Sequence, residues 1–358
     1  MTQPSAQIAS LDTPAVLVDL DIVRRNIARF QSYADQIGMA VRPHIKTHKL
    51  PQIALMQLAA GAVGITCQKI SEAEAMVAAD SRLNDVLITY NILGAEKLAH
   101  LRDLAGRVRL TVVADNAVVI DGMSAAFEGA AEPLRVLVEC NTGADRCGVA
   151  TPQHAAALAR RIADAPGLQF QGLMTYPPAN GAAAVQAFMT QAKALIEADG
   201  LAVTVITSGG TPSMMLAGDA PVATEYRPGT YAYNDRSLVA RGVCDWDDCA
   251  LTVLATVVSV PSGNRAIIDA GSKALTSDLL GLTGYGHVLG RPDIAIDQLS
   301  EEHGRLISAG PIGLAVGDRL RIVPNHACVV SNLFDTVHVL EVGKPVAVWP
   351  VVARGKVA

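Results

Sequence analysis

The segment LRVLVECNTGADRCGVATPQHAAALARRIAD, at residues 134–164, decides the fold class of the chain. Its first part, Leu134–Cys140, is an apolar run without strict alternation, which is typical of a parallel strand buried on both faces. Apolar residues then recur every three or four positions over Pro152–Asp164, which predicts an amphipathic helix. A second apolar run follows at 168–176. A strand, a helix and another strand in this order form the βαβ unit of a parallel sheet.

The same unit repeats along the first two thirds of the chain. Helices are expected at 21–37, 50–60, 71–79, 95–104, 116–126, 152–164 and 182–197. Strands are expected at 15–20, 40–45, 64–68, 85–90, 109–113, 134–140, 168–176 and 203–207. About eight repeats predict an α/β chain with a (β/α)8 barrel. A doubly wound open sheet gives the same alternation and remains the alternative.

The pattern changes near residues 241–250. Apolar β-rich runs at 251–260, 265–269, 319–323, 336–342 and 346–352 alternate with turn signals such as Pro261-Ser262-Gly263-Asn264. We therefore expect a barrel domain at 10–247 and an all-β domain at 248–358, with residues 1–9 packing on the all-β domain. No stretch rich in Pro, Gly or Ser separates the two domains.

Composition narrows the classes of partner. The 358 residues contain 29 Lys and Arg against 34 Asp and Glu, so there is no cationic excess to neutralise nucleic acid phosphates. Aromatic residues make up only 4%, which also argues against base stacking. The six cysteines form no CxxC pair, and no apolar run approaches the roughly 20 residues that span a bilayer. We expect a cytoplasmic chain with no nucleic acid or membrane partner.

The densest polar cluster is Arg-Pro-His-Ile-Lys-Thr-His-Lys at 42–49, at the end of the second expected strand. In a (β/α)8 barrel, active sites form at the carboxyl ends of the strands. An alternating strand would point Arg42, His44, Lys46 and His48 to one side. A lysine that is partly withdrawn from water is a natural Schiff-base former. The spacing alone slightly favours the alternative, a solvated basic loop after a strand.

Three further segments carry candidate site residues. Two glycine-rich loops, 207–212 and 227–231, follow the last expected barrel strand, where barrels often bind phosphate through backbone N–H groups. Arg146, in the loop after the sixth expected strand, is suited to bind an anionic oxygen. His326 and Cys328, expected on one face of a strand, combine imidazole and thiolate, the ligands of zinc and similar ions. Ordinary turns, a loop-capping arginine and a buried cysteine beside a satisfied histidine are the structural alternatives.

Together these segments resemble the D-threonine aldolase/D-serine dehydratase family, whose members use pyridoxal 5'-phosphate (PLP) on an alanine-racemase-type barrel of fold type III. The resemblance extends over nearly the whole chain, from 11–15 to 349–356. Its most specific motifs are the 42–49 cluster, Asp-Ala-Gly-Ser-Lys-Ala-Leu at 269–275, and Pro-Asn-His-Ala-Cys at 324–328.

The resemblance implies a role for each candidate. Lys46 would hold PLP covalently, Arg146 would contact the phenolic oxygen of PLP, and Tyr176 would lie near its pyridine ring. His326 and Cys328 would ligate a catalytic divalent metal (Zn, Mn or Mg). A homodimer and a small amino-acid substrate are also implied, with a supporting role for His303. The residues implied to hold the phosphate are Ser208, Gly209, Gly210, Thr211, Gly229 and Tyr231.

The implied reaction is retro-aldol cleavage of a D-threonine-like β-hydroxy amino acid to glycine and an aldehyde. The alternative is dehydration to a 2-oxo acid and ammonia; racemisation, a non-enzymatic PLP carrier and a PLP-free phosphate-binding barrel are further alternatives. Residues 66–74 resemble the aldolase branch, whereas His326-x-Cys328 resembles the dehydratase branch, because aldolases place Asp at the second position. Residues 177–180 read Pro-Pro-Ala-Asn and lack the family histidine proposed as a base.

Overall fold

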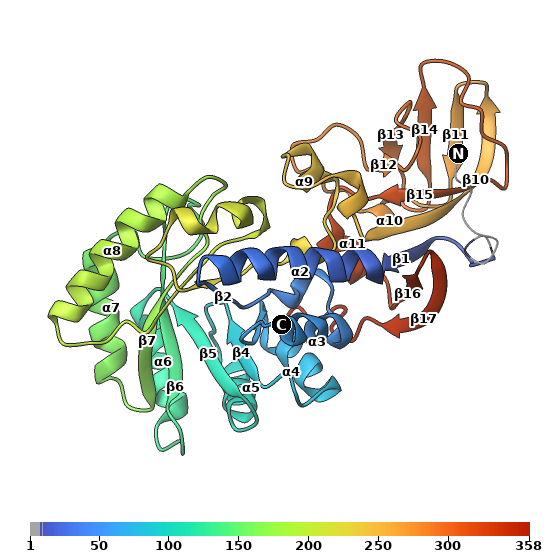
Figure 1. The fold of residues 1–358 in the computed structure, drawn as a ribbon. Coiled ribbons are helices and arrows are strands. Elements are labelled where there is room, and N and C mark those ends of the chain that lie inside the picture. The colour runs from blue at the N-terminus through green and yellow to red at the C-terminus, as the bar shows by residue number, and fades with distance from the viewer. Residues whose placement is uncertain (1–7, 9) are drawn as a thin grey trace. The chain divides into compact units, whose positions relative to one another are not determined.

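The computed structural model describes residue 8 and residues 10–358 (Figure 1). Backbone contacts divide the chain into two compact units, each of which is described by itself. The barrel unit contains residues 28–46, 51–229 and 356–358. The β unit contains residues 1–27, 47–50 and 230–355. These units are discontinuous in sequence, and the domain boundary between residues 247 and 248 stays a prediction.

The barrel unit is built on one sheet of eight parallel strands in the order β2-β9-β8-β7-β6-β5-β4-β3. The two ends of this sheet meet, because the Val63 N–H donates to Val41 O and the Thr66 N–H donates to Pro43 O. The strands therefore form a closed ring, which rules out the doubly wound open sheet. The bounds are β2 Ala40–Val41, β3 Ile65–Cys67, β4 Asp85–Ile88, β5 Arg109–Ala114, β6 Leu134–Cys140, β7 Leu168–Thr175, β8 Val205–Ser208 and β9 Glu225–Tyr226.

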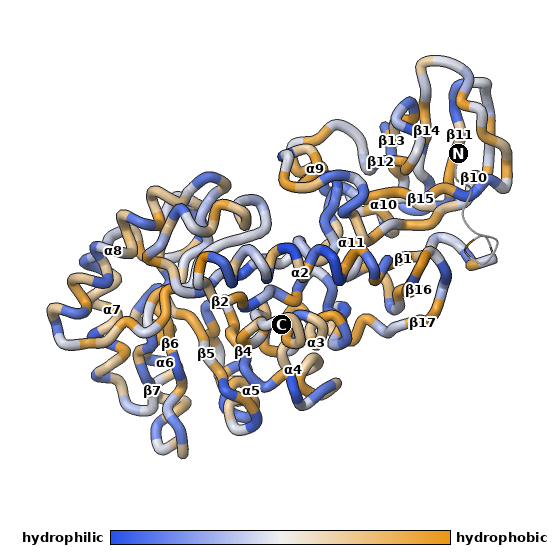
Figure 2. The backbone as a smooth tube through the Cα atoms, in the orientation of Figure 1, coloured by the Kyte–Doolittle hydropathy of each residue, from blue (hydrophilic) through white to orange (hydrophobic). Residues whose placement is uncertain are grey.

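Helices follow the strands as the βα rhythm predicts, and their first turns carry fitting side chains. Asn116 accepts a hydrogen bond from the Val119 N–H, and Thr151 accepts one from the His154 N–H, so both act as N-caps. The barrel strands are coloured mainly as hydrophobic in Figure 2. The helical bounds are α3 Pro51–Ala59, α4 Ile70–Ala79, α5 Ala95–Ala105, α6 Ala117–Phe127, α7 Pro152–Asp164, α8 Ala182–Ala198, and the 3-10 segments η1 Ile45–Thr47 and η2 Thr211–Asp219.

The strand expected at 15–20 is real but does not belong to the barrel. Strand β1 (Ala15–Asp19) pairs antiparallel with β10 and parallel with β16, in the other sheet. The eighth barrel strand is instead β9, whose two residues, Glu225 and Tyr226, are too few to give a strand pattern. The corrected count makes β2 the first barrel strand. The two glycine-rich loops then follow strands seven and eight, β8 and β9.

The β unit contains a nine-stranded sheet of order β13-β14-β11-β10-β1-β16-β17, with β12 and β15 joined through β10. Ile8 packs with Leu17, Leu254 and Leu340 in its core; the remaining residues among 1–9 lie outside the described ones. Helix α2 (Leu20–Gln36) begins in this unit and ends in the barrel unit. The other bounds are β10 Leu251–Ser262, β11 Arg265–Ile268, β12 His287–Val288, β13 Ile294–Leu299, β14 Gly304–Ser308, β15 Arg319–Val323, β16 Thr336–Glu341, β17 Lys344–Pro350, η3 Thr230–Ala232, α9 Arg236–Ala240, η4 Trp246–Asp248, α10 Ser272–Leu275 and α11 Ala327–Leu333.

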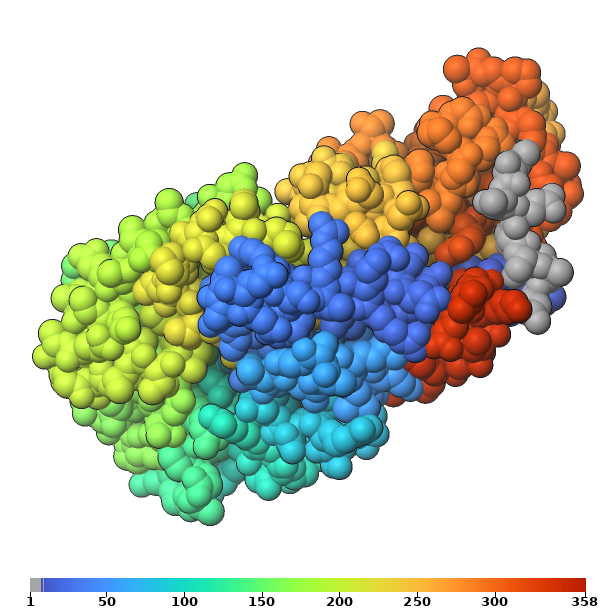
Figure 3. Space-filling view, in the orientation of Figure 1, coloured from blue at the N-terminus to red at the C-terminus, as the bar shows by residue number. Residues whose placement is uncertain are grey.

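The outer surface of the barrel unit is made by the successive βα units, whose colours run from blue to yellow in Figure 3. In residue 8 and residues 10–358, no helix is both long and apolar enough to cross a bilayer.

Candidate functional site

Lys46 lies just beyond the carboxyl end of the first barrel strand, as its sequence position predicts. The expected alternating strand over residues 42–48 is wrong, however, because β2 ends at Val41 and Lys46 is part of the 3-10 turn η1. Pro43 lacks the N–H that would extend a ladder. Lys46 is half-buried, and its N–H donates to His44 Nδ1 at 3.4 Å. The other ring nitrogen of His44 lies 3.1 Å from Gln68 Oε1, so both nitrogens of the imidazole have a partner.

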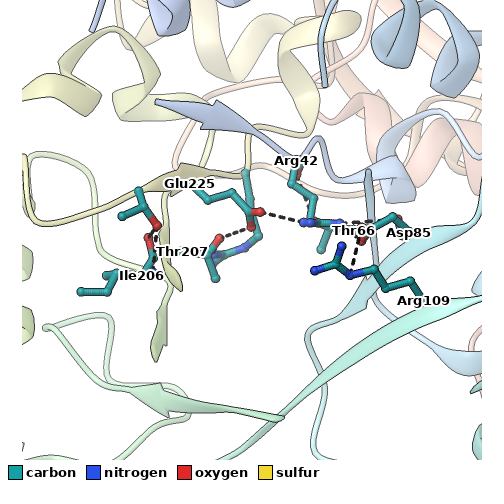
Figure 4. A network of polar contacts seen from close by, with 9 residues as sticks. Arg42, Thr66, Asp85, Arg109, Ile206, Thr207 and Glu225 are labelled. Atoms are coloured by element: carbon teal, nitrogen blue, oxygen red, sulfur yellow. Dashed lines mark hydrogen bonds and ion pairs between the residues drawn. The ribbon is translucent and has the colours of Figure 1, made fainter. Parts of the chain in front are cut away.

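Arg42 belongs to a separate ionic network, drawn in Figure 4. Its guanidinium donates to Glu225 Oε2 at 2.8 Å and to Asp85 Oδ1 at 2.6 Å. Glu225 in turn accepts a hydrogen bond from Thr207 Oγ1 at 2.7 Å. The network joins the residue that follows β2 to β4, β8 and β9, and so it holds the two-residue strand β9 in the sheet. Arg42 is therefore a structural residue of the ring, apart from Lys46.

Removal of the Arg42 guanidinium is expected to destabilise the barrel unit strongly. Arg42→Ala removes the directly bonded guanidinium of Glu225, which is only 5% exposed, and breaking a buried pair from one side costs about 3–5 kcal/mol. Arg109→Ala is the matched control, because its side chain is 64% exposed and 3.6 Å from Asp85. An exposed pair of this kind contributes about 0–1 kcal/mol. Urea denaturation measures the free energy of unfolding of both variants. Equal losses of stability would contradict the structural role of Arg42.

The loops after β6, β7 and β8 meet at the carboxyl ends of the barrel strands. The guanidinium carbon of Arg146 lies 4.7 Å from the ring centre of Tyr176, in a cation–π contact. Gly210 lies against the same ring, because a Cβ at that position would be 3.0 Å from Tyr176 Cε2. The structure therefore brings together Arg146, Tyr176 and the first glycine loop, which the sequence analysis had selected separately.

The glycine loop after β8 is closely packed. Gly209 has φ +104°, and a Cβ there would lie 2.3 Å from the ring of Tyr226, so only glycine fits. The Tyr226 hydroxyl donates to Gly210 O at 3.0 Å, and burial raises the pKa of this tyrosine to about 12. The loop leads into η2, whose N-cap is Gly210. Glycines that open a helical segment let backbone N–H groups approach a phosphate, so this loop fits the phosphate of PLP.

The two glycine loops are connected to each other. The Gly229 N–H, after β9, donates to Thr211 Oγ1, after β8, at 3.1 Å. Ser208 and Thr211 are both buried. Tyr231 is buried in η3 of the β unit, and His303 lies exposed between β13 and β14.

Two charged residues inside the barrel unit were missed by the sequence analysis. Arg227 is buried, donates to Thr175 O and Thr207 Oγ1 at 2.6 Å each, and has its pKa lowered to about 10 by burial. Burial and the neighbouring charge of Asp115 raise the pKa of Glu139 to about 7. Both residues lie in segments that the sequence pointed to, 227–231 and 134–164. A single arginine or glutamate, however, gives no indication in the sequence that its side chain is buried.

The raised pKa of Glu139 leads to a pH-dependent prediction. The folded chain keeps this proton up to about pH 7, whereas an unfolded glutamate releases it near pH 4.5. The folded state thus loses stability as pH rises through this window. Glutamine has no proton to lose. The free energy of unfolding of Glu139→Gln, relative to that of the parent, should therefore rise over the same pH interval, by on the order of 3 kcal/mol at pH 8. Urea denaturation of both proteins at pH 5 and pH 8 measures the gain; a difference that does not change with pH would contradict it.

The second candidate site lies in the β unit. His326 is the N-cap residue of α11 and Cys328 lies in its first turn, so the expected strand over 326–328 is wrong. The helix start still brings both side chains together, because His326 is hydrogen-bonded to Cys328. The sulfur of Cys328 also lies 3.1 Å from Thr47 Oγ1 and 3.6 Å from Thr230 Oγ1. Thr47 is the residue that follows Lys46 in the chain.

Asp278, which the sequence analysis did not identify, completes the surroundings of His326. Its Oδ2 lies 2.7 Å from His326 Nδ1. Burial lowers the pKa of His326, but hydrogen bonds with Cys328 and Asp278 and the charges of Cys328 and Asp235 outweigh burial and raise it to about 9.

The donor set fits a divalent metal with open positions. Imidazole nitrogen and thiolate sulfur are zinc ligands, and catalytic sites leave room for water or substrate. Within the described part of the chain, no three His, Cys, Asp or Glu residues are grouped to hold a metal. The protein would therefore supply two ligands, His326 and Cys328.

Comparisons with known proteins match both units. Residues 18–237 match the family model "Alanine racemase, N-terminal domain", and residues 250–340 match "Putative serine dehydratase domain". The D-threonine aldolase of an Arthrobacter species is 36% identical over 99% of this chain and 95% of its own length. The solved D-threonine aldolase of Filomicrobium marinum is 35% identical, covers 98% of both chains and superposes with a TM-score of 0.90.

A dehydratase is similar as well. The solved D-threo-3-hydroxyaspartate dehydratase of Delftia sp. HT23 is 32% identical over 96% of this chain and 98% of its own, with a TM-score of 0.88. Structures of such a dehydratase include a histidine-to-alanine variant and a cysteine-to-alanine variant in the metal-free form, at positions two residues apart. On these similarities and the closed barrel, the chain belongs to the D-threonine aldolase/D-serine dehydratase family of PLP-dependent enzymes, with a fold type III barrel and a C-terminal β-sheet domain.

Proposed function

We propose that this protein is a PLP- and divalent-metal-dependent lyase that cleaves D-threonine-like β-hydroxy amino acids to glycine and an aldehyde. The observation that carries the proposal is the convergence of Arg146, Tyr176 and the glycine loop after β8 in a barrel whose first strand ends before Lys46. Single polar residues recur in many folds, whereas this set supplies a covalent anchor, an anion contact and a phosphate loop on one barrel.

Each residue of the barrel unit has a defined task in this proposal. Lys46 Nζ would bind the cofactor aldehyde, and Arg146 would bind the phenolic oxygen, with Tyr176 beside the pyridine ring. PLP, when bound, supplies the electron sink for the bond that is broken. The amine of Lys46, when it is not bonded to the cofactor, would be placed to return a proton to the α-carbon and so complete glycine. Within this unit, the phosphate would be held by Ser208, Gly209, Gly210, Thr211 and Gly229.

The β unit would supply the metal. His326 Nε2 and Cys328 Sγ would hold a divalent cation (Zn, Mn or Mg), and the thiolate favours zinc among these. A bound cation of this kind polarises a hydroxyl oxygen and makes its proton easier to remove. Thr47 and Thr230, through their contacts with Cys328 Sγ, would orient the sulfur.

Dehydration to a 2-oxo acid is the second candidate, and Cys328 is the observation that favours it. The similar Delftia protein is a dehydratase, and the variant in the metal-free form is a dehydratase with its cysteine removed. The two reactions require the same residues but differ in the proton that leaves first. Retro-aldol cleavage starts at the β-hydroxyl, whereas dehydration starts at the α-carbon, where Lys46 Nζ would be the base.

The product formed from D-threonine distinguishes the two. The enzyme is supplied with PLP and Zn²⁺ or Mn²⁺, and the products are separated by chromatography. Glycine with acetaldehyde supports the aldolase, and 2-oxobutanoate with ammonia supports the dehydratase. Turnover of L-threonine at the same rate, or the appearance of only the α-epimer L-allo-threonine from D-threonine, would contradict a D-specific lyase. We also propose that the protein is a cytoplasmic homodimer. Light scattering after size-exclusion chromatography tests the oligomeric state.

A further inference from the structure

We propose that Asp278 is the positioning residue that fixes the orientation and tautomer of His326 for the divalent cation. The inference rests on the proposed metal site and adds a third residue to it. Its basis is the 2.7 Å contact between Asp278 Oδ2 and His326 Nδ1. A proton on Nδ1 is donated to this carboxylate, which leaves the lone pair of Nε2 for a metal.

The position of Asp278 is set by the residue that precedes His326. Asn325 Nδ2 donates to Asp278 O at 3.0 Å and to Gly284 O at 2.8 Å. One buried amide therefore bridges the loop that carries the carboxylate and the turn that carries the imidazole. Asn325 is 1% exposed, so its hydrogen bonds do not compete with water.

Further contacts keep the loop and the turn in place. Arg236 donates to Asn325 Oδ1 at 2.9 Å and to Thr283 O at 2.8 Å, which ties the amide to the loop after Asp278. Asp235 Oδ2 accepts the Ala327 N–H at 3.0 Å and so anchors the start of α11. The contact between Asp278 and His326 thus lies between two segments that buried hydrogen bonds hold to each other.

The backbone conformation of Thr276, two residues before Asp278, also indicates that the position of Asp278 is fixed. Thr276 is buried and has φ +66°, a left-handed conformation that residues other than glycine seldom adopt. Its hydroxyl accepts the Asp278 N–H at 3.2 Å. A strained residue persists where the surrounding structure over-determines it. Here the strain turns the chain so that Asp278 reaches the imidazole.

Because the side chain of Asp278 is partly exposed, its effect on metal binding can be measured apart from any effect on folding stability. Its side chain is 43% exposed, and ion pairs at such positions contribute little to folding stability. Loss of the carboxylate should therefore leave the fold intact. Outer partners of metal-bound histidines typically change metal affinity or activity by about 10–100-fold.

The test measures metal binding directly in the PLP-loaded enzyme. Zn²⁺ affinity is determined by competition with a chromophoric chelator, and Co²⁺ binding is followed by its visible and thiolate-to-metal absorption bands. Asp278→Ala and Asp278→Asn are expected to bind Zn²⁺ about 10–100-fold more weakly, to shift the Co²⁺ bands and to keep the parental melting temperature. Asp278→Glu should restore part of the affinity. Asp293→Asn is the control, since Asp293 is a similarly exposed carboxylate of the β unit, paired with Arg291.

The outcomes distinguish this inference from the proposed function. If His326→Ala and Cys328→Ala lose Zn²⁺ while both Asp278 variants bind within twofold of the parent, the metal site stands and the inference is wrong. If the parent itself binds no Zn²⁺ or Co²⁺ at the site, the metal part of the proposed function fails first. If Asp293→Asn weakens binding as much as Asp278→Asn, the effect is one of net charge and the positioning role is wrong.

Discussion

Lys46→Ala is expected to fold normally, to bind no PLP covalently and to lose turnover by a factor of at least about 10³. The physical reason is that Lys46 would act twice, as the covalent anchor of the cofactor and as the group that carries a proton to or from the α-carbon. The side chain is only half-buried, so its removal leaves no large cavity. The measurement is the visible absorption of the lysine-bound cofactor together with the turnover of D-threonine.

Two control variants make this prediction specific. Lys46→Arg keeps the positive charge but cannot form the covalent link, so it should lose the absorption band as alanine does. Lys193→Ala removes a lysine that is 43% exposed on α8 and should change neither readout. Retention of the band in Lys46→Ala would place the covalent link on another lysine and overturn the assignment.

Cys328→Ala is expected to lose most of its metal affinity and turnover, by about 10² or more, since one of only two protein ligands is removed. Excess Zn²⁺ should restore little activity. Cys328→Asp replaces sulfur with a harder carboxylate ligand and should regain metal, with a preference moved from Zn²⁺ towards Mn²⁺. The readouts are metal content after gel filtration and the rate with each ion.

The exposed Cys147 of the barrel unit provides the control for loss of a thiol. Cys147→Ala should match the parent in metal content and in rate. Full, chelator-resistant turnover in Cys328→Ala would exclude a metal at this cysteine. The product ratio of Cys328→Asp is informative as well: more glycine and less 2-oxo acid than in the parent would assign the choice of reaction to this ligand.

The βα rhythm predicted the barrel because its signal is repeated in every unit. The individual strand assignments failed where tertiary pairing overrides local pattern. Residues 15–20 have the composition of a barrel strand, but their partners are β10 and β16, which no local pattern identifies. Strand β9 has two residues and is held by the ionic network of Arg42 and Glu225, so its existence depends on side chains 183 positions apart.

In the candidate site, too, residues marked by a local pattern could be predicted, whereas residues brought together only by folding could not. Lys46, Arg146 and the glycine loops could be predicted because their position after a strand is itself the signal. His326 and Cys328 were found as a pair, although on a helix start and not on the expected strand. Asp278 and Asn325 could not be found, because a carboxylate 48 positions from His326 becomes its neighbour only through folding. Contacts of this kind, which determine the chemistry of a ligand, have no spacing rule in sequence.

The place of β1 in its sheet has a consequence for how the chain is made. Leu17 is hydrogen-bonded between strands that contain Thr252 and His338, so both neighbours of β1 are translated long after it. At about 5–20 residues per second, this strand waits roughly 10–50 s for its first partner. During that time it presents two unpaired apolar edges, which are sites for pairing with other chains. We therefore expect the first strand to be the segment most open to mispairing during synthesis, whereas most barrel strands pair with the next strand to emerge.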